Sequence, residues 1–274
     1  MSALADGTNL PSIGLVPGWL TTAAHWWGPD GLLLALREHV VYTAAAVLIA
    51  ALIALPVGLA VGHTGRGVVV VVGLANGLRA VPAFGFLLLL VVLITPKIKY
   101  THAIPGLVPT GGWPYVVPVE IVLVVLAVPP ILTNTYAGVQ GIDPAVRDAA
   151  RGMGMRGGQI MRQVEFPIAL PLILSGIRSS VLQVIATATI AAYLPFLGGL
   201  GAVIFNGLQQ INNTEVGYPA MIGAGIVVAA LAVVADVALI GLQRLVVSRG
   251  VSERFAHRGL SPAALGSEVA PRSA

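Results

Sequence analysis

The residue types that could carry catalysis are few in this sequence and are not spaced for it. The five histidines lie in unrelated segments and there is no cysteine, so thiol nucleophiles, thiolate metal sites and disulfides are excluded. No H-E-x-x-H helix, nucleophile elbow or G-x-x-x-x-G-K-[ST] loop occurs. The sequence therefore predicts that the chain is not an enzyme, does not hydrolyse ATP by phosphate-loop chemistry, and binds no cofactor or metal.

The most informative polar residues lie in the segment 138–167. Asp143-Pro144 joins a side-chain oxygen that can cap a helix N-terminus to a proline suited to the first helical position. This helix should stop at Gly154, because glycine accepts the left-handed conformation that ends helices. A second short helix is expected over residues 159–165, ending before Pro167. The segment is predicted to be a compact helix–turn–helix.

The first of these helices carries small residues edged by charge. Ala149 and Ala150 would let the backbone of another protein pack closely, and Arg147, Asp148 and Arg151 could fix its orientation. We interpret the segment as a docking surface for a soluble partner. The alternative is a loop that only connects its neighbours.

The composition shows what kind of chain must position this segment. Apolar residues make up 57% of the sequence and charged residues 9%, against roughly 25% charged in a soluble domain. So few charges cannot cover a water-soluble globule, and lipid is the expected surrounding. The basic residues are scattered between apolar blocks, which speaks against a nucleic-acid surface. We predict a multi-pass protein of the cell membrane.

Five apolar stretches are long enough to cross a bilayer, which takes about 20 residues. They cover residues 40–62, 68–95, 115–136, 172–194 and 220–242. They do not alternate in polarity, and they exceed the roughly 9–11 residues of a barrel strand, so the predicted fold class is all-α. Residues 195–215 are expected to form a glycine-containing turn and a short helix outside the membrane.

Basic residues should gather on the cytoplasmic side of these spans. If the C-terminus lies inside, three of them face outward: Arg37, Lys97 and Lys99. Ten then face the cytoplasm: Arg66, Arg147, Arg151, Arg156, Arg162, Arg244, Arg249, Arg254, Arg258 and Arg272. The N-terminus is therefore predicted outside, and the docking segment in the cytoplasm.

The predicted organisation has three parts. Residues 1–39 form an extracytoplasmic or interfacial segment, whose Trp19, Trp26 and Trp27 suit the lipid–water interface. Residues 40–247 form the transmembrane domain. Residues 248–274 form a cytoplasmic tail that is expected to be disordered at its end.

Two sets of polar residues fall inside the apolar stretches. Arg79 lies near Asn76, and an ionisable group at membrane depth is a functional candidate; the alternative is a side chain that reaches the interface or pairs with Asn76. Asp236 needs a partner such as Arg178. A structural pair is favoured there over proton relay, because one acid alone makes a poor relay.

The docking segment resembles the EAA loop of ABC importer permeases. That pattern reads E-A-A, three residues, G, nine residues, then I-x-L-P. This chain has Asp148-Ala149-Ala150, three residues, Gly154, nine residues, then Val164-Glu165-Phe166-Pro167. Every spacing agrees, with Asp, Val and Phe in place of Glu, Ile and Leu.

The resemblance covers roughly residues 40–245. Asn76-Gly-Leu-Arg79-Ala-Val-Pro82 looks like the N-x-x-R-x-[IV]-P stretch of the small five-span importers. Arg151-Gly-Met-Gly-Met and Gly198-Gly-Leu-Gly201 are similar to permeases for glycine betaine, carnitine and choline. Methionine-importer permeases share the five-span plan and much of this pattern.

The resemblance implies a type I importer permease with five transmembrane helices. Its partners would be two copies of a cytoplasmic ABC ATPase, a second permease that is identical or related, and an extracytoplasmic solute-binding protein. The ATPase-coupling residues it implies are Asp148, Ala149, Ala150, Arg151, Gly154, Val164, Phe166 and Pro167, and the translocation-path candidates are Asn76, Arg79 and Pro82.

The expected cargo is a quaternary-ammonium osmoprotectant: glycine betaine, carnitine, choline or a proline-type solute. An amino-acid importer of the methionine type is the alternative within transport. An ion-coupled secondary transporter is the alternative of another class, although it should show inverted repeats and several intramembrane acids.

Overall fold

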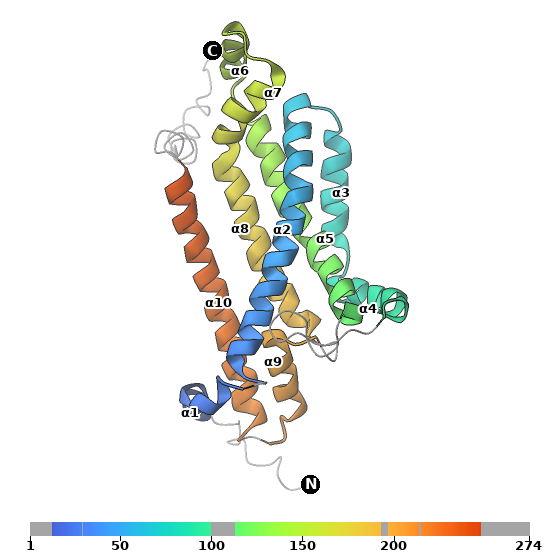
Figure 1. Ribbon diagram of the computed structural model, residues 1–274, viewed down its shortest axis with the longest axis vertical. Helices are drawn as coiled ribbons and strands as arrows, with labels where there is room; N and C mark the ends of the chain where they lie inside the picture. The colour runs from blue at the N-terminus through green and yellow to red at the C-terminus, as the bar shows by residue number, and fades with distance from the viewer. Residues whose placement is uncertain (1–12, 29, 100–112, 193–196, 214, 248–274) are drawn as a thin grey trace, which may run out of the picture.

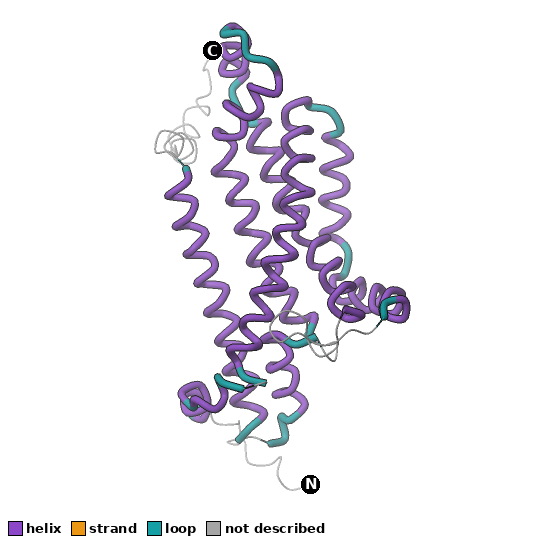
Figure 2. The backbone as a smooth tube through the Cα atoms, in the orientation of Figure 1, coloured by secondary structure: helices purple, strands orange, loops and turns teal. Residues whose placement is uncertain are grey.

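The computed structural model describes residues 13–28, 30–99, 113–192, 197–213 and 215–247. Within these ranges every regular element is helical (Figures 1 and 2). The helices are α1 (Leu15–Thr21), α2 (Leu32–Thr64), α3 (Val68–Ala80), α4 (Ala83–Ile94), α5 (Trp113–Gln140), α6 (Pro144–Gly152), α7 (Gly157–Ile160), α8 (Phe166–Ala191), α9 (Gly199–Gln209) and α10 (Gly217–Val246). The predicted all-α class is confirmed.

Four helices in the described part of the chain are long and apolar enough to cross a membrane. They are α2, α5, the continuous run Gly157–Ala191 that contains α8, and α10. The pair α3 and α4 passes the same test together and makes a fifth crossing if it is counted as one span. The five predicted spans fall on these helices, except that the fourth was expected to reach residue 194, whereas α8 ends at Ala191 and residues 193 and 194 lie outside the described residues.

The second predicted span is not one straight helix. We expected 68–95 to be continuous, but the chain bends by 88° between α3 and α4. The break falls at Pro82, which has no backbone N–H to continue the helix and whose ring disfavours the helical conformation at the residue before it. Val81 is accordingly extended, with φ −69° and ψ 125°.

The short segment before α8 also differs from expectation. The second helix was expected to end before Pro167, but the chain stays helical from Gly157 to Ala191. A π-helical turn, Met161–Glu165, lies directly before Phe166 and Pro167. This wider turn carries the chain past the proline, whose ring would clash with an ordinary preceding turn. By contrast, α9 confirms the predicted short helix in 195–215.

Helix α5 lies at the centre of the bundle, in contact with α2, α3, α4 and α8. Small residues bring the neighbouring backbones close to it. A Cβ added to Gly62 of α2 would lie 2.6 Å from the Cβ of Val139, and one added to Gly176 of α8 would lie 2.8 Å from the carbonyl oxygen of Pro130. Close approach over small residues is how membrane helices gain packing energy without a hydrophobic drive between them.

The elements gather at two ends of an elongated molecule. Figure 1 places α6, α7 and the turn between α2 and α3 at one end, toward which α10 also runs, and places α1 and α9 at the other. We call these the α6 end and the α9 end. The segments that the basic-residue pattern assigned to one side of the membrane therefore share one end of the bundle.

Candidate functional site

The helix α6 is fixed at its start and its end by local chemistry. The Oδ1 atom of Asp143 accepts a hydrogen bond from the backbone N–H of Ala145 at 2.9 Å, with Pro144 at the first helical position. At the other end Gly154 has a φ of 84°. Its N–H donates to the carbonyl of Arg151, and the next N–H donates to the carbonyl of Ala150. This pair of bonds is a Schellman motif, so the predicted N-cap and glycine stop are confirmed.

The outer face of α6 carries exposed charge. Asp148, Ala149 and Arg151 are exposed, and the Nη1 atom of Arg151 donates to the Oδ1 atom of Asp148 at 2.9 Å. A pair so open to water stabilises the helix by less than about 1 kcal/mol, so both groups remain available to a partner. Ala150 does not share this face. It is 2% exposed, which corrects the expectation of a paired-alanine surface.

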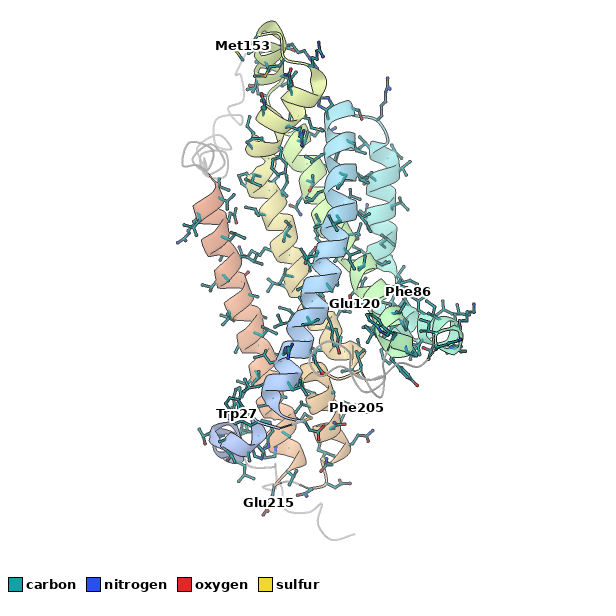
Figure 3. All side chains as sticks on the ribbon, viewed as in Figure 1. Trp27, Phe86, Glu120, Met153, Phe205 and Glu215 are labelled. Carbon is teal, nitrogen blue, oxygen red and sulfur yellow. The ribbon has the colours of Figure 1, made fainter. Side chains whose placement is uncertain are left out.

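The turn after α6 presents an apolar residue that the sequence reasoning missed. Met153 is 73% exposed, and Figure 3 shows it at the tip of the α6 end. A flexible thioether side chain in this position is suited to packing into a pocket on another protein. Only its place in the three-residue spacing between Ala150 and Gly154 could have pointed to it.

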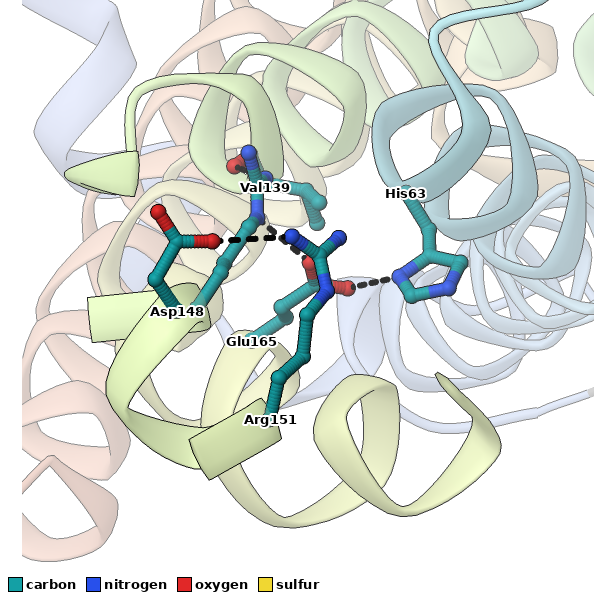
Figure 4. Close-up of polar contacts among 6 residues, drawn as sticks. His63, Val139, Asp148, Arg151 and Glu165 are labelled. Atoms are coloured by element: carbon teal, nitrogen blue, oxygen red, sulfur yellow. Dashed lines mark hydrogen bonds and ion pairs between the residues drawn. The ribbon is translucent and has the colours of Figure 1, made fainter. Parts of the chain in front are cut away.

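Arg147 turns inward instead of bordering the docking face. Its Nε atom donates to Oε1 of Glu165 at 2.6 Å, and its Nη2 atom donates to the carbonyl oxygen of Val139 at 2.6 Å. The other carboxylate oxygen of Glu165 lies 2.6 Å from Nδ1 of His63 (Figure 4). This cluster was also missed, because its members are far apart in sequence. The single signal was an acid placed between the apolar residues Val164 and Phe166.

The end of the predicted motif lies at the base of the docking segment. Val164 belongs to the π-helical turn and is half-buried. Phe166 begins α8 and packs against a small buried cluster with Val139 and Ala169, while Pro167 is exposed. These residues therefore join the segment to the bundle, and the exposed residues of α6 and its following turn form its outer surface.

The path candidates lie where α3 ends. Asn76, Arg79 and Pro82 are all exposed, and the Nη2 atom of Arg79 donates to Oγ1 of Thr133 in α5 at 3.3 Å. The hydroxyl of Thr133 in turn donates to the carbonyl of Pro129 at 2.8 Å. Arg79 is thus tied across to α5, a partner that the sequence did not identify.

Asp236 has the partner that was expected for it. The guanidinium of Arg178 in α8 donates to both carboxylate oxygens of Asp236 in α10, one of them from Nη2 at 2.8 Å. About two turns further along α10, the side chain of Gln243 donates to the carbonyl oxygen of Pro171 in α8 at 3.3 Å. Polar contacts of this kind hold α10 against α8. No group of three or more His, Cys, Asp or Glu within the described ranges could hold a metal ion.

The long apolar helices define a multi-pass membrane protein. The chain belongs to the family of binding-protein-dependent transport system inner membrane components, which it matches over residues 46–249. It is therefore an integral inner-membrane transport protein; the composition and spans predicted the membrane location, and the resemblance of the docking segment implied transport.

Its curated relatives are permeases. It is 31% identical over 220 residues to the glycine betaine/carnitine/choline transport system permease protein OpuCB of Bacillus subtilis, covering 80% of this chain and 90% of that one. It is 31% identical to the carnitine transport permease OpuCB of Listeria monocytogenes, covering 81% and 91%. It is 30% identical to the osmoprotectant import permease OsmW of Salmonella typhimurium, covering 78% and 91%.

Solved structures of importers share the fold. An inward-facing structure of the MetNI methionine ABC transporter matches with a TM-score of 0.63 at 19% identity, covering 79% of this chain and 96% of that chain. A crystal structure of an amino acid ABC transporter with histidines matches with a TM-score of 0.55 at 21% identity, covering 78% and 91%. At these identities the likeness concerns the arrangement of helices alone.

Proposed function

We propose that the chain is the transmembrane permease subunit of an ATP-binding-cassette importer for quaternary-ammonium osmoprotectants. The cargo would be glycine betaine, carnitine, choline or a proline-type solute. The observation that carries the proposal is the similarity to permeases for glycine betaine, carnitine, choline and osmoprotectants, which extends over most of both chains. The methionine transporter is similar in fold alone, so it supports the architecture and not the cargo.

The α6 segment is the proposed contact with a cytoplasmic ATPase. Asp148, Ala149 and Arg151 offer exposed charge and a small residue, and Met153 offers an apolar anchor at the tip. Charge that fixes orientation around a central apolar group is the usual arrangement of a specific protein interface. The α6 end then faces the cytoplasm, and the α9 end faces the binding protein.

The complete importer would hold two ATPase copies, this permease with an identical or related second permease, and the extracytoplasmic solute-binding protein. ATP hydrolysis belongs to the ATPase. Closure of the two ATPases around ATP would displace α6, and the helices would rock between inward-open and outward-open states. We assign Asn76, Arg79 and Pro82, at the break between α3 and α4, to the substrate path.

A competition assay tests the cargo. The permease is expressed with its ATPase and binding protein in a bacterial strain that lacks osmoprotectant importers, and uptake of labelled choline and glycine betaine is measured. Excess unlabelled glycine betaine, carnitine or choline should suppress uptake, and excess methionine should not. Methionine uptake without osmoprotectant uptake would contradict the assignment.

A surface variant tests the docking face. Met153→Ser should weaken co-purification of the ATPase by about tenfold, because truncating one buried apolar anchor of an interface costs on the order of 1–2 kcal/mol. Ile211→Ser at the α9 end is the matched control, since Ile211 is also an exposed apolar residue, at 40%. Equal ATPase binding by the two variants would refute the assignment of α6 as the contact.

A further inference from the structure

A buried carboxylate joins four segments at the α6 end. Glu165 is 0% exposed, and its two oxygens are held by Arg147 and His63 at 2.6 Å each. Arg147 belongs to α6, His63 to the last turn of α2, and Glu165 to the π-helical turn before α8. The second contact of Arg147, to the carbonyl of Val139, adds the end of α5. Glu165 and Arg147 together thus connect the docking helix to three of the long helices.

These contacts bind the segments tightly to one another. Short charge-assisted hydrogen bonds to a carboxylate are about twice as strong as hydrogen bonds between neutral groups. Removing either partner of a buried carboxylate is strongly destabilising, because the charge is left uncompensated. His63 is also confined on its other side, because a Cβ added to Gly157 of α7 would lie 3.4 Å from its Nε2 atom. A displacement of α6 therefore acts on His63 through Glu165.

Helix α2 extends that connection to the far end of the molecule. Near its first turns, Glu38 accepts a hydrogen bond from the N–H of Gly199, at the start of α9, at 2.8 Å. Tyr42 donates to the carbonyl of Leu197 at 2.9 Å, and His39 lies 3.1 Å from the carbonyl oxygen of Ile185 in α8. Polar contacts thus fasten both ends of α2, which spans residues Leu32–Thr64.

Between these ends α2 is closely packed against α5. Gly58 and Gly62 lie one helical turn apart on the contact face, and a Cβ at either would fall within 2.9 Å of Thr135 or Val139. Such close contact over small residues packs this stretch of α2 densely and gives it little freedom to bend.

We propose that the Glu165–His63 contact is the link through which motion of α6 is passed to α2, and by α2 to the α9 end. Glu165 and His63 are positioning residues: neither belongs to the exposed face of α6 or to the residues assigned above to the substrate path. The proposal rests on the proposed docking of the ATPase on α6, and it adds the route that the motion takes from there.

The test separates transmission from docking. His63→Ala removes the contact to α2 and leaves the Arg147–Glu165 pair in place. The variant is assembled with the ATPase and binding protein in proteoliposomes, and solute uptake is divided by ATP hydrolysed. We expect the ATPase to co-purify as with the wild type and the ratio to fall about tenfold, within the range of coupling between sites in allosteric proteins. Because the ratio does not depend on abundance, lower expression does not affect it.

Two further variants sharpen the result. His63→Asn, whose amide nitrogen can take the place of Nδ1, should recover most of the ratio. Thr64→Ala is the control, since Thr64 is the exposed neighbour whose hydroxyl donates to the carbonyl of Ala60 in its own helix; its ratio should equal that of the wild type. A wild-type ratio in His63→Ala would overturn the proposal. Loss of ATPase binding in His63→Ala would also overturn it, by making the cluster part of docking.

Failure of the proposed function would look different. In that case the wild-type chain itself would not bind the ATPase, or Met153→Ser would bind it as well as the wild type. The His63 variants are therefore compared only after the wild-type assembly has been shown to hydrolyse ATP and to take up solute.

Discussion

Replacing Gly154 with alanine is expected to weaken ATPase docking through backbone conformation alone. Gly154 has a φ of 84° and closes the Schellman motif that ends α6. A Cβ at this position meets nothing within 4 Å, so the substitution creates no clash within the chain. What remains is the cost of holding an L-residue in the left-handed region, about 1–2 kcal/mol. That cost corresponds to a loss of about 5- to 30-fold in the population that presents α6 correctly.

Gly152→Ala supplies the matched control. Gly152 is the last residue of α6, and a Cβ there also meets nothing within 4 Å, but its φ lies outside the positive range. Alanine is favoured over glycine in a helix by up to about 1 kcal/mol. The same added methyl group should therefore leave docking unchanged or slightly stronger at 152 and weaken it at 154. Gly154→Asn should lie between them, because asparagine tolerates the left-handed conformation better than alanine.

The assay is the affinity of the purified ATPase for each detergent-solubilised permease variant, read beside its membrane abundance. The spans should insert normally in all three variants, since the substitutions lie outside the long apolar helices. Equal ATPase affinity for Gly152→Ala and Gly154→Ala would refute the reasoning, because it would show that the geometry after α6 does not control docking.

Three other predictions concern the membrane domain. Arg178→Leu should leave the carboxylate of Asp236 without its ion-pair partner in the apolar helix α10 and lower the yield of folded permease, since an unpaired ionised group within a membrane-spanning segment is unfavourable. The double variant Arg178→Leu/Asp236→Leu should restore the yield, and no restoration would count against a structural pair. Reporter fusions after Arg66 and near Gly157 should both read cytoplasmic, and a fusion near residue 105 should not. The purified chain alone should show no ATP hydrolysis, because it lacks a phosphate loop; turnover at a rate typical of transporters without a partner would contradict this.

The elements that sequence reasoning predicted are those fixed by local chemistry. A stretch of about 20 apolar residues has no alternative to a spanning helix, so α2, α5, α8 and α10 were found. The caps of α6 were found for the same reason, since Asp143 and Gly154 act within a few residues of their own position.

The errors arose where two local rules compete. Pro82 and Pro167 each follow residues with strong helical pattern, yet the chain breaks at the first and continues past the second. The break at Pro82 was hidden by the apolar length of the whole stretch, and the π-helical turn before Pro167 leaves no mark in composition. Ala150 is buried although Ala149 beside it is exposed, because neighbouring residues on a helix point about 100° apart and one side of α6 faces the rest of the protein.

The Glu165 cluster could not be predicted because its partners are set by packing. His63 and Glu165 are separated by 102 positions in the chain, and each residue alone fits an ordinary turn or span end. Their meeting depends on the close approach of α2 and α5 over Gly58 and Gly62, which only the folded bundle defines. Long-range ion pairs of this kind need the three-dimensional arrangement.

Reconstituted transport tests the central claim most directly. Proteoliposomes containing this permease and its ATPase are loaded with ATP, and the solute-binding protein and labelled choline or glycine betaine are supplied on the opposite side. The account predicts accumulation of the label against its gradient that requires ATP, the ATPase and the binding protein together. Accumulation by the permease alone, driven by an ion gradient without ATP, would contradict it.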